Sequence, residues 1–404
     1  MGARAADLRD RPLHVEPEQR AEVGGPALPR SPRPGLAVRH AATRPRVPVM
    51  GARRRASGAA SRAQAARPVL VTGATGFVGQ ALVPALLARG RAVRATTRAL
   101  RDDLDPRVEW VRADVTRPAE LPAALEGVDA AYFLVHGMAS GREDYADDER
   151  RAAAFFAREA GIAGVRRIVY LGGVAPRGRP SKHLASRLAV GEVLRAGRVP
   201  TLELRASMIV GPGSASWRIV RDLAMRLPAM VLPAWARSRS CPIAIEDVVA
   251  ALVAALDVPL PESAWYDVPG PEVLSVRDIL ERVAALRGRA LPAVEAPLPH
   301  PRISALWLKL VSDAPWQVVR ELVQGLSHDL LPRDDRYWAL TGLPPRTRFE
   351  EAARRALAED EGRRPGGVRG WVLSAEELLV DRLAPRQQET VRPTTPPTPH
   401  PRRG

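Results

Sequence analysis

Residues 68–90 constrain the fold of this chain more than any other segment. An apolar run at 69–71 predicts a short strand, residues 72–79 read TGATGFVG, and apolar residues then recur at helical spacing. A helix that follows such a turn presents unpaired backbone amides and the positive end of its dipole to a phosphate. The segment therefore predicts the strand–turn–helix unit of a dinucleotide-binding α/β fold.

Each glycine of this turn has its own predicted role. Gly73 permits the tight turn, Gly76 lets the backbone approach a pyrophosphate, and Gly79 lets the helix pack closely on the strand. Gly90 ends the helix, and Pro84 inside it predicts a kink or a lost backbone hydrogen bond. A turn with a purely structural role is the alternative interpretation.

The Gly-x-x-Gly-x-x-Gly spacing resembles the turn of extended and atypical short-chain dehydrogenases/reductases, of the epimerase/dehydratase-like or nitrogen-metabolite-repressor-like kind. The resemblance covers about residues 68–361, through segments 113–115, 129–136, 165–173, 181–187, 205–213, 242–249 and 322–335. It implies a Rossmann-type α/β fold, a doubly wound parallel sheet with a small C-terminal substrate lobe. It also implies that Asp114, which follows the third strand, lies beside the adenine.

The cofactor site implied by this resemblance combines the turn with the ends of later strands: Gly73, Thr75, Gly76, Phe77, Val78, Gly79, Arg98, Asp114, Val115, Leu134, Val135 and Gly172. NAD enzymes place a carboxylate after the second strand, where this chain has Thr97 followed by Arg98. Arg98, helped by Arg94 or Arg101, can pair with the 2′-phosphate of NADP. We therefore expect NADP rather than NAD; an ordinary surface role for Arg98 is the alternative.

The family's catalytic Tyr-x-x-x-Lys motif is absent from its usual place. The best match is residues 183–187, where His183 stands for the tyrosine and Arg187 for the lysine. In the functional interpretation, His183 is a general acid/base, since imidazole titrates near neutrality, and Arg187 holds ribose hydroxyls. His136, at the end of the fourth strand, is a second imidazole candidate. In the other interpretation His183 is a helix-surface residue and the chain binds cofactor without turnover.

The net charge of +16 comes mainly from the two end segments. Residues 1–67 contribute +9 and residues 362–404 contribute +4, which leaves +3 for the 294 residues between them. A nucleic-acid-binding domain carries its basic residues on the folded body, so we expect no nucleic-acid partner. Both ends lack apolar periodicity, and we expect both to be disordered. Met50 begins a repeat of the opening MGAR and is an alternative start.

Composition excludes several other classes of site. The single cysteine, Cys241, excludes a disulfide framework and a thiolate zinc cluster and favours the reducing cytoplasm. The seven histidines include no pair at helical ligand spacing beside a supporting acid, so we expect no metal. No apolar run reaches 18 residues, which argues against an integral membrane protein. We expect a cytoplasmic protein whose partner is a small-molecule substrate.

These patterns divide the chain into a basic extension (1–67), an NAD(P)-binding Rossmann domain (68–290), a C-terminal helical lobe (291–361) and a Pro/Arg-rich tail (362–404). Segment 216–232 is amphipathic and segment 304–311 is helical in pattern, and both contain tryptophan. Such residues form a core or line an apolar cleft. We predict an NADP-linked oxidoreductase of a small apolar carbonyl or alcohol. The alternative is a noncatalytic dinucleotide-binding redox sensor or assembly scaffold.

Overall fold

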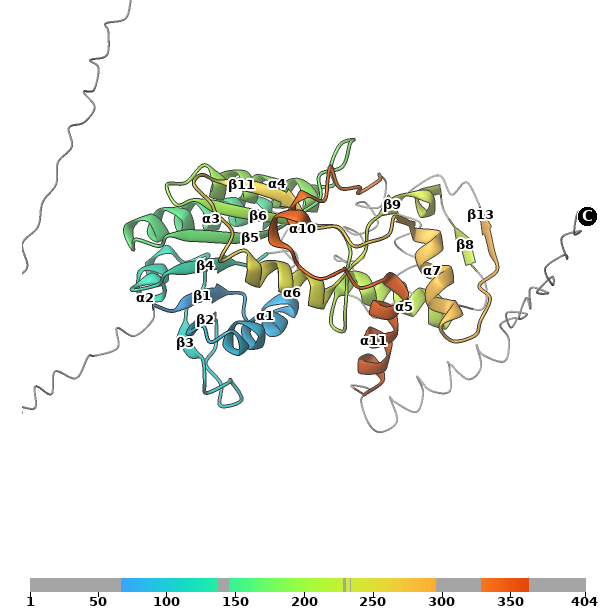
Figure 1. Cartoon of the computed structure of the whole chain (residues 1–404), viewed down its shortest axis with the longest axis horizontal. Helices are drawn as coiled ribbons and strands as arrows, with labels where there is room; N and C mark the ends of the chain where they lie inside the picture. Colours follow the sequence, from blue (N-terminus) through green and yellow to red (C-terminus); the bar gives the residue numbers. More distant parts are fainter. Residues whose placement is uncertain (1–66, 137–144, 228–229, 233, 296–327, 363–404) are drawn as a thin grey trace, which may run out of the picture. The chain divides into compact units, whose positions relative to one another are not determined.

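The computed structural model describes residues 67–136, 145–227, 230–232, 234–295 and 328–362. Most of both predicted tails and the predicted helix at 304–311 lie outside these residues. Within them, one seven-stranded sheet has the order β11-β6-β5-β4-β1-β2-β3, with every neighbouring pair parallel (Figure 1). The strands are β1 (Val69–Thr72), β2 (Val93–Thr97), β3 (Glu109–Arg112), β4 (Ala130–Phe133), β5 (Arg167–Gly173), β6 (Thr201–Ala206) and β11 (Ala264–Asp267). The predicted doubly wound parallel sheet is confirmed.

Helices cover both faces of the sheet. Val69 and Val71 of β1 pack toward one face, with α1 (Phe77–Ala88) and α6 (Ile245–Ala254), whereas Leu70 packs toward the other. The second face is covered by α2 (Leu121–Leu125), α3 (Tyr145–Ile162) and α4 (Lys182–Arg195). Because both faces are buried, the central strands β1 and β4 are nearly continuous apolar runs, whereas β6 also buries the charged side chains of Glu203 and Arg205.

The boundaries of the strands shift slightly from those predicted. The fourth strand was expected over 129–136, but β4 ends at Phe133, so His136 lies in the segment that follows the strand. Pro84 does not break α1, which is continuous from Phe77 to Ala88. Gly90, with a φ of 69°, follows the end of this helix as predicted.

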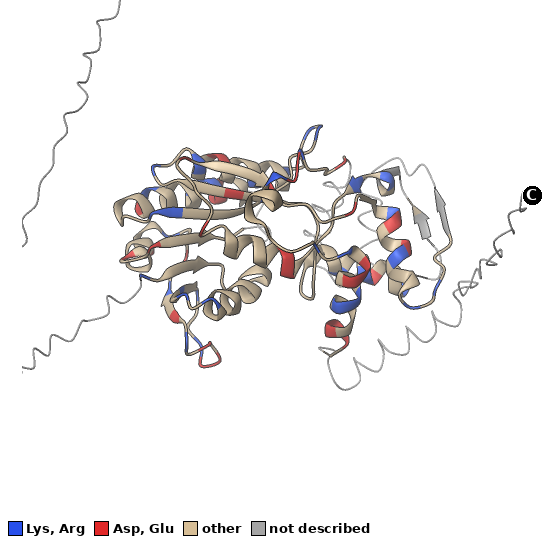
Figure 2. Ribbon diagram, viewed as in Figure 1, with Lys and Arg blue, Asp and Glu red and all other residues tan. Residues whose placement is uncertain are grey.

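A second hydrophobic core lies outside the sheet. Its helices are α5 (Ala215–Arg226), α7 (Val276–Ala285) and α11 (Phe349–Gly362), with Trp217 fully buried among them. Members of this core run from Val210 to Leu357, on both sides of position 290. Because this core draws residues from both sides of position 290, it does not mark a boundary there. The predicted domain boundary between residues 290 and 291 stays a prediction. Figure 2 shows charged residues of both signs along α7 and α11.

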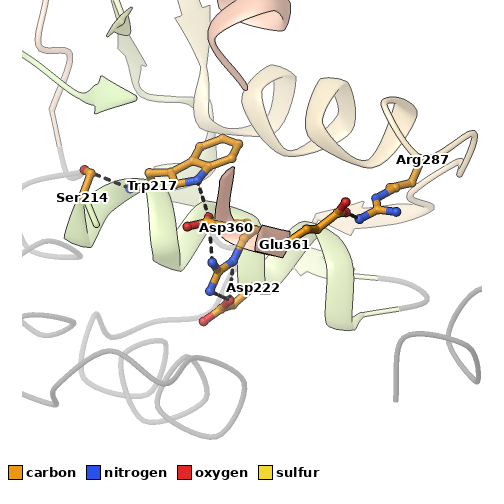
Figure 3. Close-up of polar contacts among 7 residues, drawn as sticks. Ser214, Trp217, Asp222, Arg287, Asp360 and Glu361 are labelled. Atoms are coloured by element: carbon orange, nitrogen blue, oxygen red, sulfur yellow. Dashed lines mark hydrogen bonds and ion pairs between the residues drawn. The ribbon is translucent and has the colours of Figure 1, made fainter. Parts of the chain in front are cut away.

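Polar contacts fasten α11 to α5 and to the end of α7 (Figure 3). The carboxylate of Asp360 accepts a hydrogen bond from the Trp217 indole at 3.0 Å and another from the Arg221 guanidinium at 2.7 Å. Glu361 pairs with Arg287, just beyond α7. The two bonds of Asp360 satisfy the polar atom of a buried tryptophan and join segments about 140 residues apart in the sequence.

The predicted amphipathic segment 216–232 contains two elements rather than one. Helix α5 ends at Arg226, and β8 (Met230–Leu232) follows it. The buried Arg289 guanidinium donates to the carbonyls of Met225 and Leu227 at 2.7 and 2.9 Å. Arg289 therefore satisfies carbonyl groups left without partners at the end of this helix.

Short elements complete the part of the chain that the structure describes. They are η1 (Pro118–Glu120), β7 (Ile209–Val210), η3 (Ala234–Arg237), β9 (Arg239–Ser240), β10 (Ile243–Ala244), β12 (Leu274–Ser275), β13 (Ala293–Glu295) and α10 (Arg336–Thr341). Strand β10 and helix α6 confirm the late strand and helix start predicted within 242–249. Among the described residues, no helix has both the length and the apolar character needed to cross a bilayer.

Candidate functional site

The glycine turn lies between β1 and α1, and its backbone is packed against itself. Gly73 has a φ of 69°, which favours glycine, and a Cβ there would lie 3.0 Å from the Leu134 carbonyl oxygen. A Cβ on Gly79 would lie 2.3 Å from the Gly73 oxygen, a distance that real structures do not tolerate. The tight turn at Gly73 and the close packing at Gly79 are therefore confirmed.

Gly76 differs from the other two glycines because it is exposed. It is the N-cap of α1, no side chain caps this helix, and a Cβ would meet only the Gly73 oxygen within 4 Å. Thr75 is exposed beside it, and Phe77 and Val78 begin the helix half-buried. The turn thus offers uncapped helix amides at an exposed position, which suits a pyrophosphate.

Thr72 fixes the turn against the neighbouring strand, a role that the sequence did not reveal. Its buried hydroxyl donates to the Tyr132 carbonyl at 2.9 Å and accepts the Leu134 amide at 3.2 Å. From β1 the sheet adds β2 and β3 on one side, and β4 and the later strands on the other side. In parallel α/β sheets, ligands bind beyond the carboxyl ends of the strands where the strand order reverses in this way. A buried threonine directly before the first glycine was the available signal. Leu134 and Val135, half-buried after β4, adjoin the same turn.

The arginines near the end of β2 have different surroundings. Arg94 donates to the carbonyls of Ala124 and Glu126 and pairs with Glu109 at 2.8 Å, so it is committed to the sheet edge. Arg101 pairs with Asp103 at 3.1 Å. Arg98 is exposed, and within the described residues no hydrogen bond or ion pair of its side chain is found. Of the three arginines considered for a 2′-phosphate, Arg98 is therefore the one whose side chain has no acidic partner within the described residues.

Asp114 follows β3 and orders its own loop. One carboxylate oxygen accepts the Thr116 amide at 2.9 Å and the Thr116 hydroxyl at 2.7 Å, and the Asp114 amide donates to Glu120 at 2.8 Å. Val115 beside it is buried in the core under α2 and α3. These bonds fix the position of Asp114, and its contact with an adenine stays a prediction.

The two candidate imidazoles, 47 residues apart in the sequence, are brought together by the fold. Ser181 caps α4 by accepting the Leu184 amide at 3.3 Å, which places His183 in the first helical turn. The ring of His183 lies 6.4 Å from that of His136, centroid to centroid, with the planes at 74°. The Nδ1 atom of His183 is buried and has no hydrogen-bond partner among the described residues. This nitrogen is therefore able to form a hydrogen bond with a bound molecule.

Both imidazoles are held neutral, contrary to the expectation that His183 titrates near neutrality. Loss of solvent, followed by the positive charge of Arg187 and then by His136, lowers the pKa of His183 to about 3. The same loss of solvent and Arg187 lower the pKa of His136 to about 4, although part of this side chain is exposed. A neutral imidazole donates a hydrogen bond to a carbonyl oxygen but does not carry a proton to it as imidazolium.

Arg187 lies over the end of β5. Its guanidinium donates to the Leu171 carbonyl, and its own carbonyl accepts the Tyr170 hydroxyl at 3.0 Å. Burial raises the pKa of Tyr170, so this tyrosine is held protonated within the sheet. Lys182 turns toward α3, where its ammonium lies 5.3 Å from the centre of the Tyr145 ring.

Gly172 has a packing role that its predicted place in the cofactor site did not suggest. A Cβ there would lie 2.6 Å from a carboxylate oxygen of Glu203, which is fully buried in β6. Glu203 pairs with Arg205 at 2.8 Å and with Arg195 of α4. The missing side chain thus leaves room for a buried ion cluster, and a contact of Gly172 with cofactor stays a prediction. Over the described part of the chain, no group of three acidic, histidine or cysteine side chains is placed to bind a metal ion.

Comparisons with known proteins agree with this geometry. Residues 73–221 match the model of an NAD(P)H-binding family. The chain is similar to ceramide reductase of Caulobacter vibrioides, at 34% identity over 205 residues that make up 48% of this chain and 62% of that enzyme. It is also similar to a 3-diazoavenalumate denitrifying reductase of a Streptomyces species, at 30% identity over 57% of this chain and 86% of the other. The chain thus spans less than two thirds of the length of the ceramide reductase.

The fold is similar to that of the solved structure of MoeE5 in complex with UDP-glucuronic acid and NAD. The TM-score is 0.56, the sequence identity is 19%, and the match covers 73% of this chain and 99% of that one. At this identity the likeness supports the Rossmann architecture and no statement about substrate.

Proposed function

Because this chain belongs to the NAD(P)-binding short-chain dehydrogenase/reductase superfamily, we propose that it is an NADP-linked oxidoreductase of a small, rather apolar carbonyl or alcohol. The observation that carries the proposal is the pairing of His183 with His136 at the edge of the sheet where the glycine turn also lies. A phosphate-binding turn and polar groups beside the neighbouring strand ends together make a place for cofactor and substrate.

The residues of this site fit an NADP cofactor. Gly76 is exposed at an uncapped helix N-terminus, Gly73 keeps the turn tight, and the exposed Arg98 is available to a 2′-phosphate. When bound, the nicotinamide would supply or accept the hydride. Arg98 would pair with the phosphate through charge-assisted hydrogen bonds, which an NAD ribose cannot offer.

His183 would act as a neutral hydrogen-bond donor. Its buried Nδ1 atom is the one without a partner, and donation from that atom would stabilise negative charge on the substrate oxygen. A donor held in place by the first turn of α4 needs no rearrangement during the reaction. The proton that completes the alcohol then comes from solvent, because the imidazole is not protonated at neutral pH.

Arg187 would keep a second role besides its bond to Leu171. It stands one helical turn after His183, so the two side chains share a face of α4. Its remaining N–H groups can donate to ribose hydroxyls, and its charge helps to keep both imidazoles neutral.

A noncatalytic dinucleotide sensor or scaffold is the second candidate. The Tyr-x-x-x-Lys pair is missing, and the low pKa values of His136 and His183 deprive the site of a proton carrier at neutral pH. These two observations favour binding without turnover.

One pair of measurements separates the candidates. NADPH binding is titrated by calorimetry, and NADPH oxidation is then followed with a panel of aliphatic and aromatic ketones, aldehydes and quinones. Binding with turnover of a panel member supports the oxidoreductase. Binding without turnover across the panel supports the sensor, and an absence of binding contradicts both.

A further inference from the structure

The loop of residues 174–181 joins β5 to α4 and so delivers His183 to the site. Gly178 is part of this loop, and the ring of His328 occupies the space that a side chain at position 178 would need. A Cβ on Gly178 would lie 2.6 Å from Cδ2 and 2.8 Å from Nε2 of that ring. Gly178 is not among the glycines with positive φ, and the three atoms nearest to such a Cβ all belong to the exposed ring of His328.

His328 is anchored by the residues that follow it. The carboxylate of Asp329 accepts the Arg239 amide at 2.7 Å and the Arg239 guanidinium at 2.7 and 3.1 Å. The Leu330 amide donates to the Arg239 carbonyl at 2.8 Å, and Leu330 forms a parallel bridge with Ser240. Asp329 and Leu330 are therefore bound beside β9 (Arg239–Ser240) through an isolated parallel bridge and the bonds to Arg239.

The same segment is bound again where it passes the end of β11. The Arg333 amide donates to the buried Asp267 carboxylate at 2.7 Å, and the Arg333 guanidinium lies 5.0 Å from the centre of the Trp265 ring. We call residues 328–333 the strap. The strap contacts the loop before α4, β9 and the sheet edge, which are far apart in the sequence.

We propose that His328 is a positioning residue, which by packing on Gly178 holds the 174–181 loop so that His183 stands beside His136. The strap is bound to β9 and to the end of β11, and these bonds fix His328. The 174–181 loop packs on His328 and leads directly into the first turn of α4, which contains His183. The proposal rests on the proposed function only for the role of His183. The geometry itself is tested without turnover.

The test is a double-mutant cycle of Gly178→Ala and His328→Ala, with Gly362→Ala as the matched control. A Cβ on Gly362 meets nothing within 4 Å, and its φ is not positive. The readouts are the ¹H–¹⁵N ring signals of His136 and His183, amide hydrogen exchange in residues 174–181, and NADPH affinity. His183→Gln and His136→Gln assign the two sets of ring signals.

We expect Gly178→Ala to shift both sets of ring signals and to speed exchange in the loop by about fivefold, the effect of a typical coupling between contacting residues. His328→Ala should do the same, and adding Gly178→Ala to it should change nothing more. NADPH affinity should stay unchanged, because the glycine turn is separate from the strap. Additive effects of the two substitutions, or ring signals unmoved by either, would overturn the proposal. If Gly178→Ala does not fold, unchanged ring signals in His328→Ala alone overturn it.

If the ring signals respond as expected but no panel carbonyl is reduced, the positioning role stands and the oxidoreductase proposal fails. If turnover is found but neither Gly178→Ala nor His328→Ala shifts the ring signals, the oxidoreductase proposal stands and the positioning role fails. The two results are therefore distinguishable.

Discussion

The glycine turn and the histidine pair lie at the same end of the sheet but depend on different interactions. The turn consists of backbone packed on backbone: a Cβ would lie 2.3 Å from the Gly73 oxygen at buried Gly79 and 3.2 Å from it at exposed Gly76. The histidine pair consists of side chains whose protonation is governed by lost solvent and by Arg187. The comparison teaches that the turn is sensitive to any added atom, whereas the pair is sensitive to any change of charge or water.

The largest expected effect is on turnover. His183→Ala should lower the rate with any carbonyl that the panel identifies by about 10²–10³-fold, because it removes the donor to the developing negative charge. NADPH affinity, measured by calorimetry, should barely change, since the turn at Gly76 does not depend on this ring. Arg187→Ala is the counterpart and should weaken NADPH binding. Full turnover in His183→Ala would remove His183 from the mechanism and direct attention to His136.

A second test compares two glycines of the turn. Gly79→Ala forces a methyl group to 2.3 Å from the Gly73 oxygen, so we expect it to cost about 3 kcal/mol of unfolding free energy. Gly76→Ala, at an exposed site, should cost about 1 kcal/mol or less, yet weaken NADPH binding about tenfold or more. Urea denaturation and calorimetry measure the two effects. Equal stability of the two variants would contradict the separation of packing from binding.

The third effect concerns the choice between NADPH and NADH. Arg98→Ala should weaken NADPH binding by about 1.5–3 kcal/mol, the usual contribution of a hydrogen bond to a charged group, and leave NADH binding unchanged. Arg101→Ala serves as the control, because Arg101 is also exposed but pairs with Asp103. An equal loss for both cofactors would show that Arg98 does not contact the 2′-phosphate.

A smaller effect follows from the lowered pKa of His183. The folded pKa of about 3 lies below the ordinary value of 6.5, so between these pH values the unfolded chain binds a proton that the folded chain does not. Stability should therefore fall as the pH drops from 6.5 toward 3, and His183 has no effect above pH 7. Between pH 6.5 and pH 4.5 we expect His183→Gln to lose roughly 2–3 kcal/mol less stability than the wild type, because each pKa unit crossed corresponds to about 1.4 kcal/mol. If the urea midpoint falls by the same amount from pH 7 to pH 4.5 in the wild type and in His183→Gln, the ring of His183 is not held neutral by loss of solvent.

The sequence predicted the turn and the sheet well because their requirements are local. The positive φ of Gly73 and the close packing at Gly79 follow from residue type and spacing alone. Strand ends and helix starts were likewise predicted to within a few residues. The second core was predicted only as a small C-terminal lobe. Its assembly from helices on both sides of position 290 was not predicted, because these helices lie far apart in the sequence.

The site's chemistry was less predictable, because it depends on tertiary contacts. The residue types at 136 and 183 named the two imidazoles, but only the fold sets the 6.4 Å between them and the loss of solvent that keeps them neutral. Gly172 matched the family's cofactor position, yet its neighbour is the carboxylate of Glu203, 31 residues later. No local pattern carries such information.

The smallest expected effect lies at the predicted boundary between residues 67 and 68. The sequence assigned Arg67 to the basic extension, but its guanidinium donates to the Val128 carbonyl at 2.7 Å and to the Gly127 carbonyl at 3.2 Å. If the two end segments contribute nothing to the core, a chain of residues 67–362 should melt within about a degree of the full chain. A chain of residues 68–362 should lose about 1 kcal/mol, because the two carbonyls lose a charged donor near the surface. Calorimetric melting of the three proteins measures both steps. A drop of several degrees at the first step would show that an end segment packs on the core, and no difference at the second would show that the Arg67 bonds contribute nothing in solution.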